Sequence, residues 1–246
     1  MEKNFFIFIG IGILAQLIDG ALGMAFGVSS TTILLSIGVS PALASASVHA
    51  AEIVTTAVSG LSHFSFGNVD INLVKKLLLP GVSGAVIGAY ILSNVPGEVM
   101  KPIISGYLLI MGIIIIYKAF KKPQPKEVKT HLIPLGLIGG FLDAIGGGGW
   151  GPVVVSTLVA RGNTPRFSIG SVNLAEFFVA LSASVTFFLT LSQVNWQVIA
   201  GLAIGGAITA PVAAYVTKRL PTQTLMYLVG ILISLLSIRS ILLAIL

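Results

Sequence analysis

The chain has 246 residues, of which 55% are hydrophobic and only 9% are charged. Because soluble domains carry about 25% charged residues, this composition excludes a globule that folds in water and predicts an all-α integral membrane protein. The chain has no cysteine, which excludes disulfides and thiolate metal sites, and its net charge of +6 lies in short loops, which favours a topology signal over a nucleic-acid partner.

Eight apolar runs follow one another, and each predicts membrane helix because a spanning helix needs roughly 20 apolar residues. They cover residues 4–38, 41–62, 74–95, 99–118, 132–160, 167–192, 195–216 and 222–246. The most polar segment, 118–131, contains five lysines and two prolines. We therefore divide the chain into a first membrane repeat (1–118), a cytoplasmic linker (119–131) and a second membrane repeat (132–246).

The two halves match one another when the sequence is shifted by 124 positions, which places Asp19 on Asp143. The same shift aligns Gly23 with Gly147, Phe26 with Trp150, Gly27 with Gly151, Gly38 with Gly162, Pro41 with Pro165, and the segment 47–52 with the segment 171–176. Apolar bias aligns leucine, isoleucine and valine by chance, but it does not align acidic residues, glycine and proline in order. We therefore expect two homologous halves in a polytopic helical bundle.

The first run of each half is interrupted by an acidic residue and a cluster of glycines. Residues 4–38 and 132–160 are each long for one crossing and short for two, since two crossings need roughly 40 residues. Glycine costs about 1 kcal/mol relative to alanine in a helix, so we expect the backbone to unwind near Asp19 and Asp143. Unwound backbone at membrane depth is tolerated only where protein or a water-filled cavity satisfies it.

The distribution of basic residues favours a re-entrant hairpin for each broken run. With hairpins, eleven of the 14 Lys and Arg residues fall on one side of the membrane and only Lys3, Lys101 and Arg239 on the other, whereas single crossings divide them nine to five. The positive-inside rule then places the linker in the cytoplasm and both termini outside. Each half makes three crossings plus one hairpin, and this odd number inverts the second half, as in many secondary transporters. Pairs of short tilted helices are the alternative, and they give the same inversion.

Each interruption is a candidate anion site. A broken helix exposes backbone N–H groups at a helix N-terminus, where an anion binds without a cationic side chain, and glycine lets it approach the backbone. The candidate binding residues are Asp19, Gly23 and Gly27 in the first half and Asp143, Gly147, Gly148, Gly149, Trp150 and Gly151 in the second. The alternative is that the glycines allow close helix packing and that the aspartates only cap the half-helices.

The helix after each interruption carries a second set of polar residues. Ser45, His49, Glu52, Thr56 and Ser59 share one helical face, and the second half repeats the pattern with Asn173 and Glu176; Ser47 and Ser171 begin the repeated segments. Ionisable residues inside a membrane indicate a substrate pathway or a proton relay. His49 and Asn173 can donate hydrogen bonds to an oxyanion, while Glu52 and Glu176 can titrate or hold the site in shape. The alternative is that these groups are structural ties.

Two sequence elements, repeated in both halves, resemble those of the sulfite exporter TauE/SafE family. They are D-x-x-x-G-x-x-[FW]-G, which begins at Asp19 and Asp143, and S-V-x-x-A-E, which begins at Ser47 and Ser171. The resemblance covers nearly the whole chain. It implies a multi-pass membrane protein that carries sulfite, sulfonates or other sulfur-containing anions, with the substrate bound at the residues of these elements.

We therefore expect a secondary transporter in the cell membrane that exports a small sulfur-containing anion. Import would instead need a coupling ion, such as a proton. Each negative charge that leaves a negative interior gains roughly 2.3 kcal/mol per 100 mV. The sequence has no nucleotide-binding P-loop, zinc-protease motif or hydrolase elbow, so we expect no enzyme activity, cofactor or metal. An anion channel on the same scaffold and a non-transporting membrane assembly subunit are the alternative functions.

Overall fold

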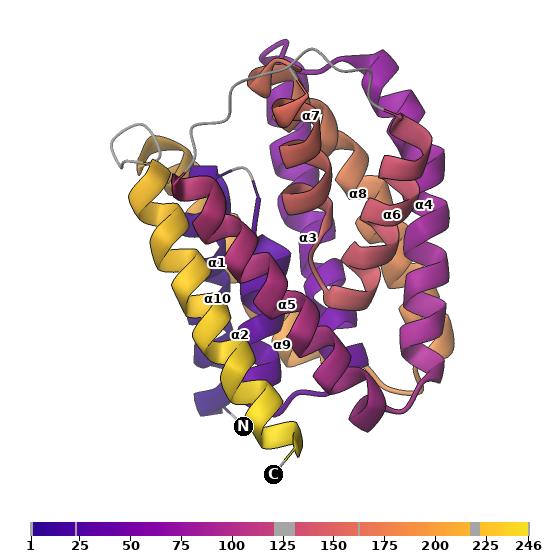
Figure 1. The fold of residues 1–246 in the computed structure, drawn as a ribbon, viewed down its shortest axis with the longest axis vertical. Helices are drawn as coiled ribbons and strands as arrows, with labels where there is room; N and C mark the ends of the chain where they lie inside the picture. Colours follow the sequence, from indigo (N-terminus) through magenta and orange to yellow (C-terminus); the bar gives the residue numbers. More distant parts are fainter. Residues whose placement is uncertain (1, 23, 121–130, 162, 217–221, 246) are drawn as a thin grey trace.

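A computed structural model describes residues 2–22, 24–120, 131–161, 163–216 and 222–245. Within these ranges every regular element is a helix, which confirms the predicted all-α class (Figure 1). The helices are α1 (Glu2–Leu22), α2 (Phe26–Ser36), α3 (Pro41–Ser65), α4 (Ile71–Asn94), α5 (Gly97–Phe120), α6 (Leu132–Gly146), the π-helix η1 (Trp150–Val155), α7 (Ser156–Ala160), α8 (Pro165–Thr190), α9 (Trp196–Val216) and α10 (Thr222–Ile245).

Four of the described helical segments are long and apolar enough to cross a membrane. They are Ile71–Asn94, Gly97–Phe120, Phe167–Thr190 and Met226–Leu243, and α1, α2, α6 and α9 contain shorter apolar stretches. Large apolar side chains are exposed along these helices, including Leu79 and Leu189. Contiguous exposed apolar surface marks an interaction site, in this case the surface expected of a helical bundle in lipid.

The first run of each half breaks at the predicted place. α1 ends at Leu22 and α2 begins at Phe26, while α6 ends at Gly146 and η1 begins at Trp150. Gly147 ends α6 with a φ of 63°, in the left-handed region that glycine adopts without a steric penalty. In Figure 1 the chain turns after α6 and returns through α7 toward the end of the molecule where α6 begins.

Helices from the two halves pack in matching pairs. α4 lies along α6 and α1 lies along α9, and exchanging the halves converts one pair into the other because α1 corresponds to α6 and α4 to α9. The corresponding helices α5 and α10 also lie along each other, as do α3 and α8. These four pairings are therefore unchanged when the halves are exchanged.

Two of the helix pairs formed between the halves pack antiparallel, α5 with α10 and α3 with α8. Phe120 at the end of α5 stacks against Tyr227 near the start of α10, with ring centroids 5.0 Å apart, and Gly112 lies against Ser234. In α3, Gly60 lies against Leu174, whereas His49, earlier in the chain, lies against Phe187, later in the chain. Each pair is therefore antiparallel, as Figure 1 shows for α5 and α10.

Glycines bring the helices of the two halves close together, as expected where helices associate in lipid. A Cβ atom added at Gly84 of α4 would fall 2.8 Å from the backbone nitrogen of Phe141 in α6 and would overlap the carbonyl of Leu137. Backbone atoms cannot move aside without shifting the whole helix, so this position accepts only glycine.

We expect Gly84→Ala to lower the stability of the protein by about 1–3 kcal/mol, the range for overpacking a tight contact. The measurement is the thermal unfolding midpoint of the protein purified in detergent, followed by tryptophan fluorescence. Gly106→Ala on α5 is the matched control, because nothing lies within 4 Å of a Cβ atom there. Equal midpoints for the two variants would contradict the close α4–α6 contact.

Candidate functional site

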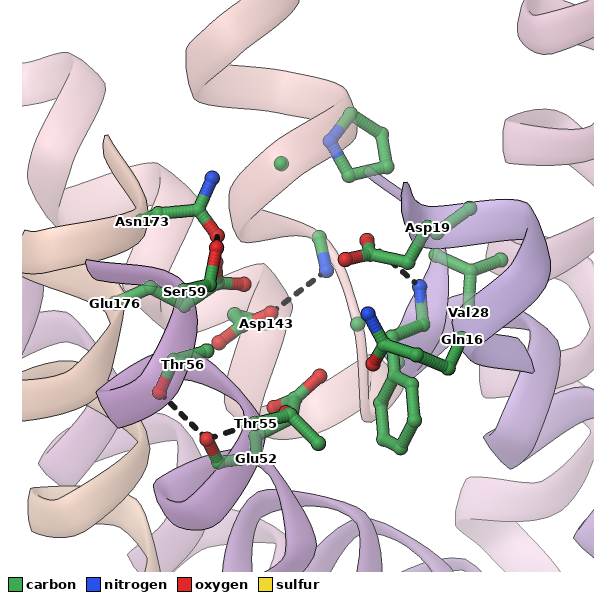
Figure 2. A pocket seen from close by; sticks show the side chains of 17 residues that line it. Gln16, Asp19, Val28, Glu52, Thr55, Thr56, Ser59, Asp143, Asn173 and Glu176 are labelled. Atoms are coloured by element: carbon green, nitrogen blue, oxygen red, sulfur yellow. Dashed lines mark hydrogen bonds between the residues drawn. The ribbon is translucent and has the colours of Figure 1, made fainter. Parts of the chain in front are cut away.

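A small cavity lies where α1, α2, α3, α6, η1 and α8 meet. Its volume of about 20 Å³ is enough for about one water molecule. Four carboxylates line it, Asp19 and Glu52 from the first half and Asp143 and Glu176 from the second. Figure 2 shows the carboxylates of Asp19, Glu52 and Asp143 gathered around the same space.

The two aspartates cap the two broken helices in the same way. Oδ1 of Asp19 accepts a hydrogen bond from the backbone nitrogen of Phe26 at 3.3 Å, seven residues later. Oδ1 of Asp143 accepts one from Trp150, also seven residues later, at 2.9 Å, and one from Gly149 at 2.8 Å. The capping role that the sequence left as an alternative is therefore present in both halves.

Capping does not use all the N–H groups at these helix starts. The first-turn amides of a helix have no partner within it, and Gly27 and Val28 of α2 and Gly151 of η1 line the cavity. Two helix N-termini, one from each half, therefore end at one cavity. Each contributes the positive end of its helix dipole to that cavity.

The two interruptions touch each other across the interface between the halves. A Cβ atom added at Gly27 would fall 2.6 Å from the carbonyl oxygen of Gly147 and 2.7 Å from the Cα atom of Gly148. The hydroxyl of Thr31 donates to the carbonyl of Gly147 at 2.8 Å. Gly148 and Gly149 also line the cavity, whereas Gly23 lies outside the described residues.

His49 faces Asp143 and lies behind the cavity lining. Its side chain is fully buried, and Nε2 lies 3.2 Å from Oδ2 of Asp143. The other ring nitrogen, Nδ1, lies 2.8 Å from the carbonyl oxygen of Ser45. The Ser45 hydroxyl donates to the carbonyl of Ala144. His49 thus fixes the carboxylate that caps η1, although 94 residues separate the two in the sequence.

The glutamates and Asn173 complete the wall of the cavity. Glu52 is 3% exposed and its Oε2 has no hydrogen-bond partner, whereas Glu176 is partly exposed. Asn173 donates to the carbonyl of Ile169 in its own helix and accepts from the hydroxyl of Ser59 at 3.2 Å, as Figure 2 shows. His49 and Asn173, which occupy matching positions, therefore have different partners.

Like Ser45, His49 and Gly147, three further predicted residues lie outside the lining, and they bond to the surrounding helices. Ser47 donates to the carbonyl of Leu43. Ser171 accepts from the backbone nitrogen of Asp70 at 2.8 Å. The ring nitrogen of Trp150, which is buried, donates to the carbonyl of Val172 at 3.1 Å.

Besides Thr31, Tyr107 and Lys118 are residues outside the predicted set that contact the second half's broken helix. Tyr107 of α5 donates to the carbonyl of Gly148 at 3.1 Å. The ammonium of Lys118 donates at 3.3 Å to the carbonyl of Pro152, which lines the cavity. Ser105 and Tyr117 also carry hydroxyls in the apolar run 99–118, so no sequence signal singles out Tyr107.

The cavity is acidic, and no Lys or Arg is among the described residues that line it. Two unit charges about 5 Å apart interact with about 3 kcal/mol at an effective dielectric constant of 20. An anion in this cavity gains from the helix N-termini but is repelled by every carboxylate that is ionised. Charge compensation is therefore a requirement for anion binding here.

Together, the fold and this cavity define a class: polytopic helical membrane proteins with a polar site between two broken helices. The sequence profile of the family described as "Sulfite exporter TauE/SafE" matches residues 8–240, so the chain belongs to this family.

Two proteins of Bacillus subtilis (strain 168) are similar to this chain over most of their length. "Probable membrane transporter protein YtnM" is 47% identical over 248 residues, which cover 97% of this chain and 83% of that protein. "Probable membrane transporter protein YdhB" is 24% identical over 217 residues, which cover 84% and 86%. No solved structure matches the chain.

We expect Asp143→Ala to lower stability by about 3–5 kcal/mol, because it leaves two buried amides and His49 without their partner. Asp70→Ala is the control, since Asp70 caps α4 at an exposed helix end and should cost only about 1 kcal/mol. The measurement is the thermal unfolding midpoint in detergent. Equal losses for the two variants would show that the Asp143 cap does not hold the second interruption.

Proposed function

We propose that the protein is a secondary transporter that carries a small sulfur-containing anion, such as sulfite or an organosulfonate, across the cell membrane. The carrying observation is that residues from the first turns of two broken helices, one from each half, line one cavity. Helix N-termini are favourable sites for oxyanions. Membership of the TauE/SafE family supports a sulfur oxyanion as the class of substrate, and the names of the two relatives support membrane transport.

We propose that the two halves are inverted repeats that rock about the cavity. The antiparallel pairing of α5 with α10 and of α3 with α8 supports this arrangement. In inverted-repeat transporters, discontinuous helices meet near the bilayer midplane and the halves move against each other to alternate access. A cavity at the interface of the halves is where such motion opens a path to either side.

The substrate in this proposal lies between the interruptions, against Gly27 and Gly151, with Asn173 donating a hydrogen bond from α8. His49 acts through Asp143, whose carboxylate it holds in place. A cavity with room for one water molecule is smaller than an oxyanion, which supports a carrier that must open to load over a permanently open channel. Because the cell interior is negative, the membrane potential drives a divalent anion such as sulfite outward.

Flux through proteoliposomes tests this function. We expect vesicles loaded with radiolabelled sulfite, and others loaded with methanesulfonate, to lose anion faster than protein-free vesicles. Loss of divalent sulfite should be faster still when a potassium gradient and valinomycin make the interior negative. Asn173→Ala and His49→Ala should each reduce the rate about tenfold, since a hydrogen bond to a charged group contributes about 1.5–3 kcal/mol.

Ser62→Ala is the matched control on the same helix as His49, because the exposed Ser62 hydroxyl bonds only to its own backbone. Wild-type flux in both site variants would refute the assignment of these residues. Currents far above the turnover of a carrier would identify a channel. The absence of flux, together with copurification of another protein, would identify an assembly subunit.

The proposed topology places the central linker in the cytoplasm and both termini outside. Because the chain has no cysteine, Gln124→Cys and Asn4→Cys each introduce a unique thiol. We expect a membrane-impermeant maleimide to label the Asn4→Cys protein in intact cells and to label the Gln124→Cys protein only after permeabilisation. The reverse pattern would overturn the orientation.

A further inference from the structure

We propose that Glu52, together with the buried His49–Asp143 pair, forms the site of a coupling proton that loads with the anion. This proposal rests on the transport function above and deepens it by naming the group that carries the proton. The side-chain atoms of His49, Asp143 and Glu52 that can bind a cation lie within 4.8 Å of one another, and all three residues are buried.

The hydrogen-bond partners of His49 indicate which of its ring nitrogens carries a hydrogen. Nδ1 of His49 faces the carbonyl oxygen of Ser45, which can only accept a hydrogen bond, so Nδ1 carries a hydrogen. The Ser45 hydroxyl, 3.3 Å from the same nitrogen, has its hydrogen directed at Ala144 and also accepts. Nε2 therefore faces Oδ2 of Asp143 at 3.2 Å, and this contact is a hydrogen bond only when one of the two atoms carries a second proton.

Asp143 has little capacity for a further ligand. Its Oδ1 accepts two backbone hydrogen bonds, from Gly149 and Trp150, and its Oδ2 faces His49. Glu52 differs, because its Oε2 is buried without any partner and the side chain lines the cavity. A buried carboxylate oxygen with no donor is the atom in this cluster that gains most from binding a proton.

The charged surroundings of Glu52 favour the same conclusion. Asp19 of α1, Asp143 of α6 and Glu176 of α8 line the same cavity, and Tyr107 of α5 contacts the glycine turn behind it. α2 and η1 carry no titratable side chain, and His49 is on the same helix as Glu52. With no Lys or Arg in the described lining, an entering anion is repelled until a carboxyl group is neutralised, so the proton and the anion bind together.

A proton fits this cluster better than a metal ion. The three side chains have the spacing for a metal, but Asp143 and His49 are already joined to each other and Asp143 also holds two amides. Of the three residues only Glu52 has a carboxylate left over, and its two oxygens are too few ligands for a divalent cation, which takes at least four. Dependence of transport on an added divalent cation is therefore an outcome that would overturn the proton assignment.

Accumulation driven by a pH gradient tests the proposal. Proteoliposomes contain equal methanesulfonate inside and outside, the membrane potential is clamped at zero, and the outside is one pH unit more acidic. Methanesulfonate stays ionised throughout, so any proton that moves is bound by the protein. One proton per anion predicts about tenfold accumulation of the labelled anion inside, because one pH unit corresponds to a factor of ten.

Glu52→Gln should abolish this accumulation, with the ratio of inside to outside anion falling to about one. Glu98→Gln, at an exposed position at the start of α5, is the matched control and should keep the tenfold ratio. Wild-type protein that exchanges anion but shows no accumulation would overturn the coupling proton and leave the transport function intact. The absence of any anion exchange would instead overturn the transport function itself.

A second measurement covers the case in which Glu52→Gln fails to fold. Calorimetric titration of purified wild-type protein with methanesulfonate, in buffers of different ionisation enthalpy, reports the protons taken up per anion bound. We expect uptake of about one proton at neutral pH and less as the pH falls and Glu52 is already protonated. Binding with no proton uptake at any pH would overturn the proposal.

Discussion

A helix that stops inside an apolar bundle leaves N–H groups that water cannot reach, and the rest of this structure depends on how those groups are satisfied. Unsatisfied backbone groups at membrane depth cost several kcal/mol each. Asp19 and Asp143 meet part of this requirement, each through a hydrogen bond to the residue seven positions later. Gly27, Val28 and Gly151 of the two first turns line the cavity, which is why a structural interruption also makes a candidate binding site.

The same constraint explains the asymmetry between two halves that share one plan. Asp143 accepts two backbone hydrogen bonds, pairs with His49 and is 1% exposed, whereas Asp19 accepts one longer bond and is partly exposed. Where the first half has His49, the second has Asn173, which bonds to Ser59 instead. Both interruptions line the cavity, but the second is held by more hydrogen bonds than the first.

The sequence predicted the features that recur locally and missed those that depend on contact between the halves. Asp19 and Asp143, with glycines at fixed spacing, located both interruptions, and the repeat matched Phe26 to Trp150, the residues that begin the two half-helices. It also matched His49 to Asn173 and so suggested equal roles for them. It could not show that His49 reaches Asp143, 94 residues away, or that Tyr107 and Lys118 contact the second interruption, because these contacts arise only when the halves pack.

The proposed transport function depends on an anion that binds between the N-termini of α2 and η1. A crystal structure with selenite, which has the shape and charge of sulfite and an anomalous scatterer at its centre, measures that location directly. We expect a selenium peak between Gly27 and Gly151, with oxygens within hydrogen-bond distance of their amides. A peak only at the protein surface, or in a different part of the bundle, would contradict it.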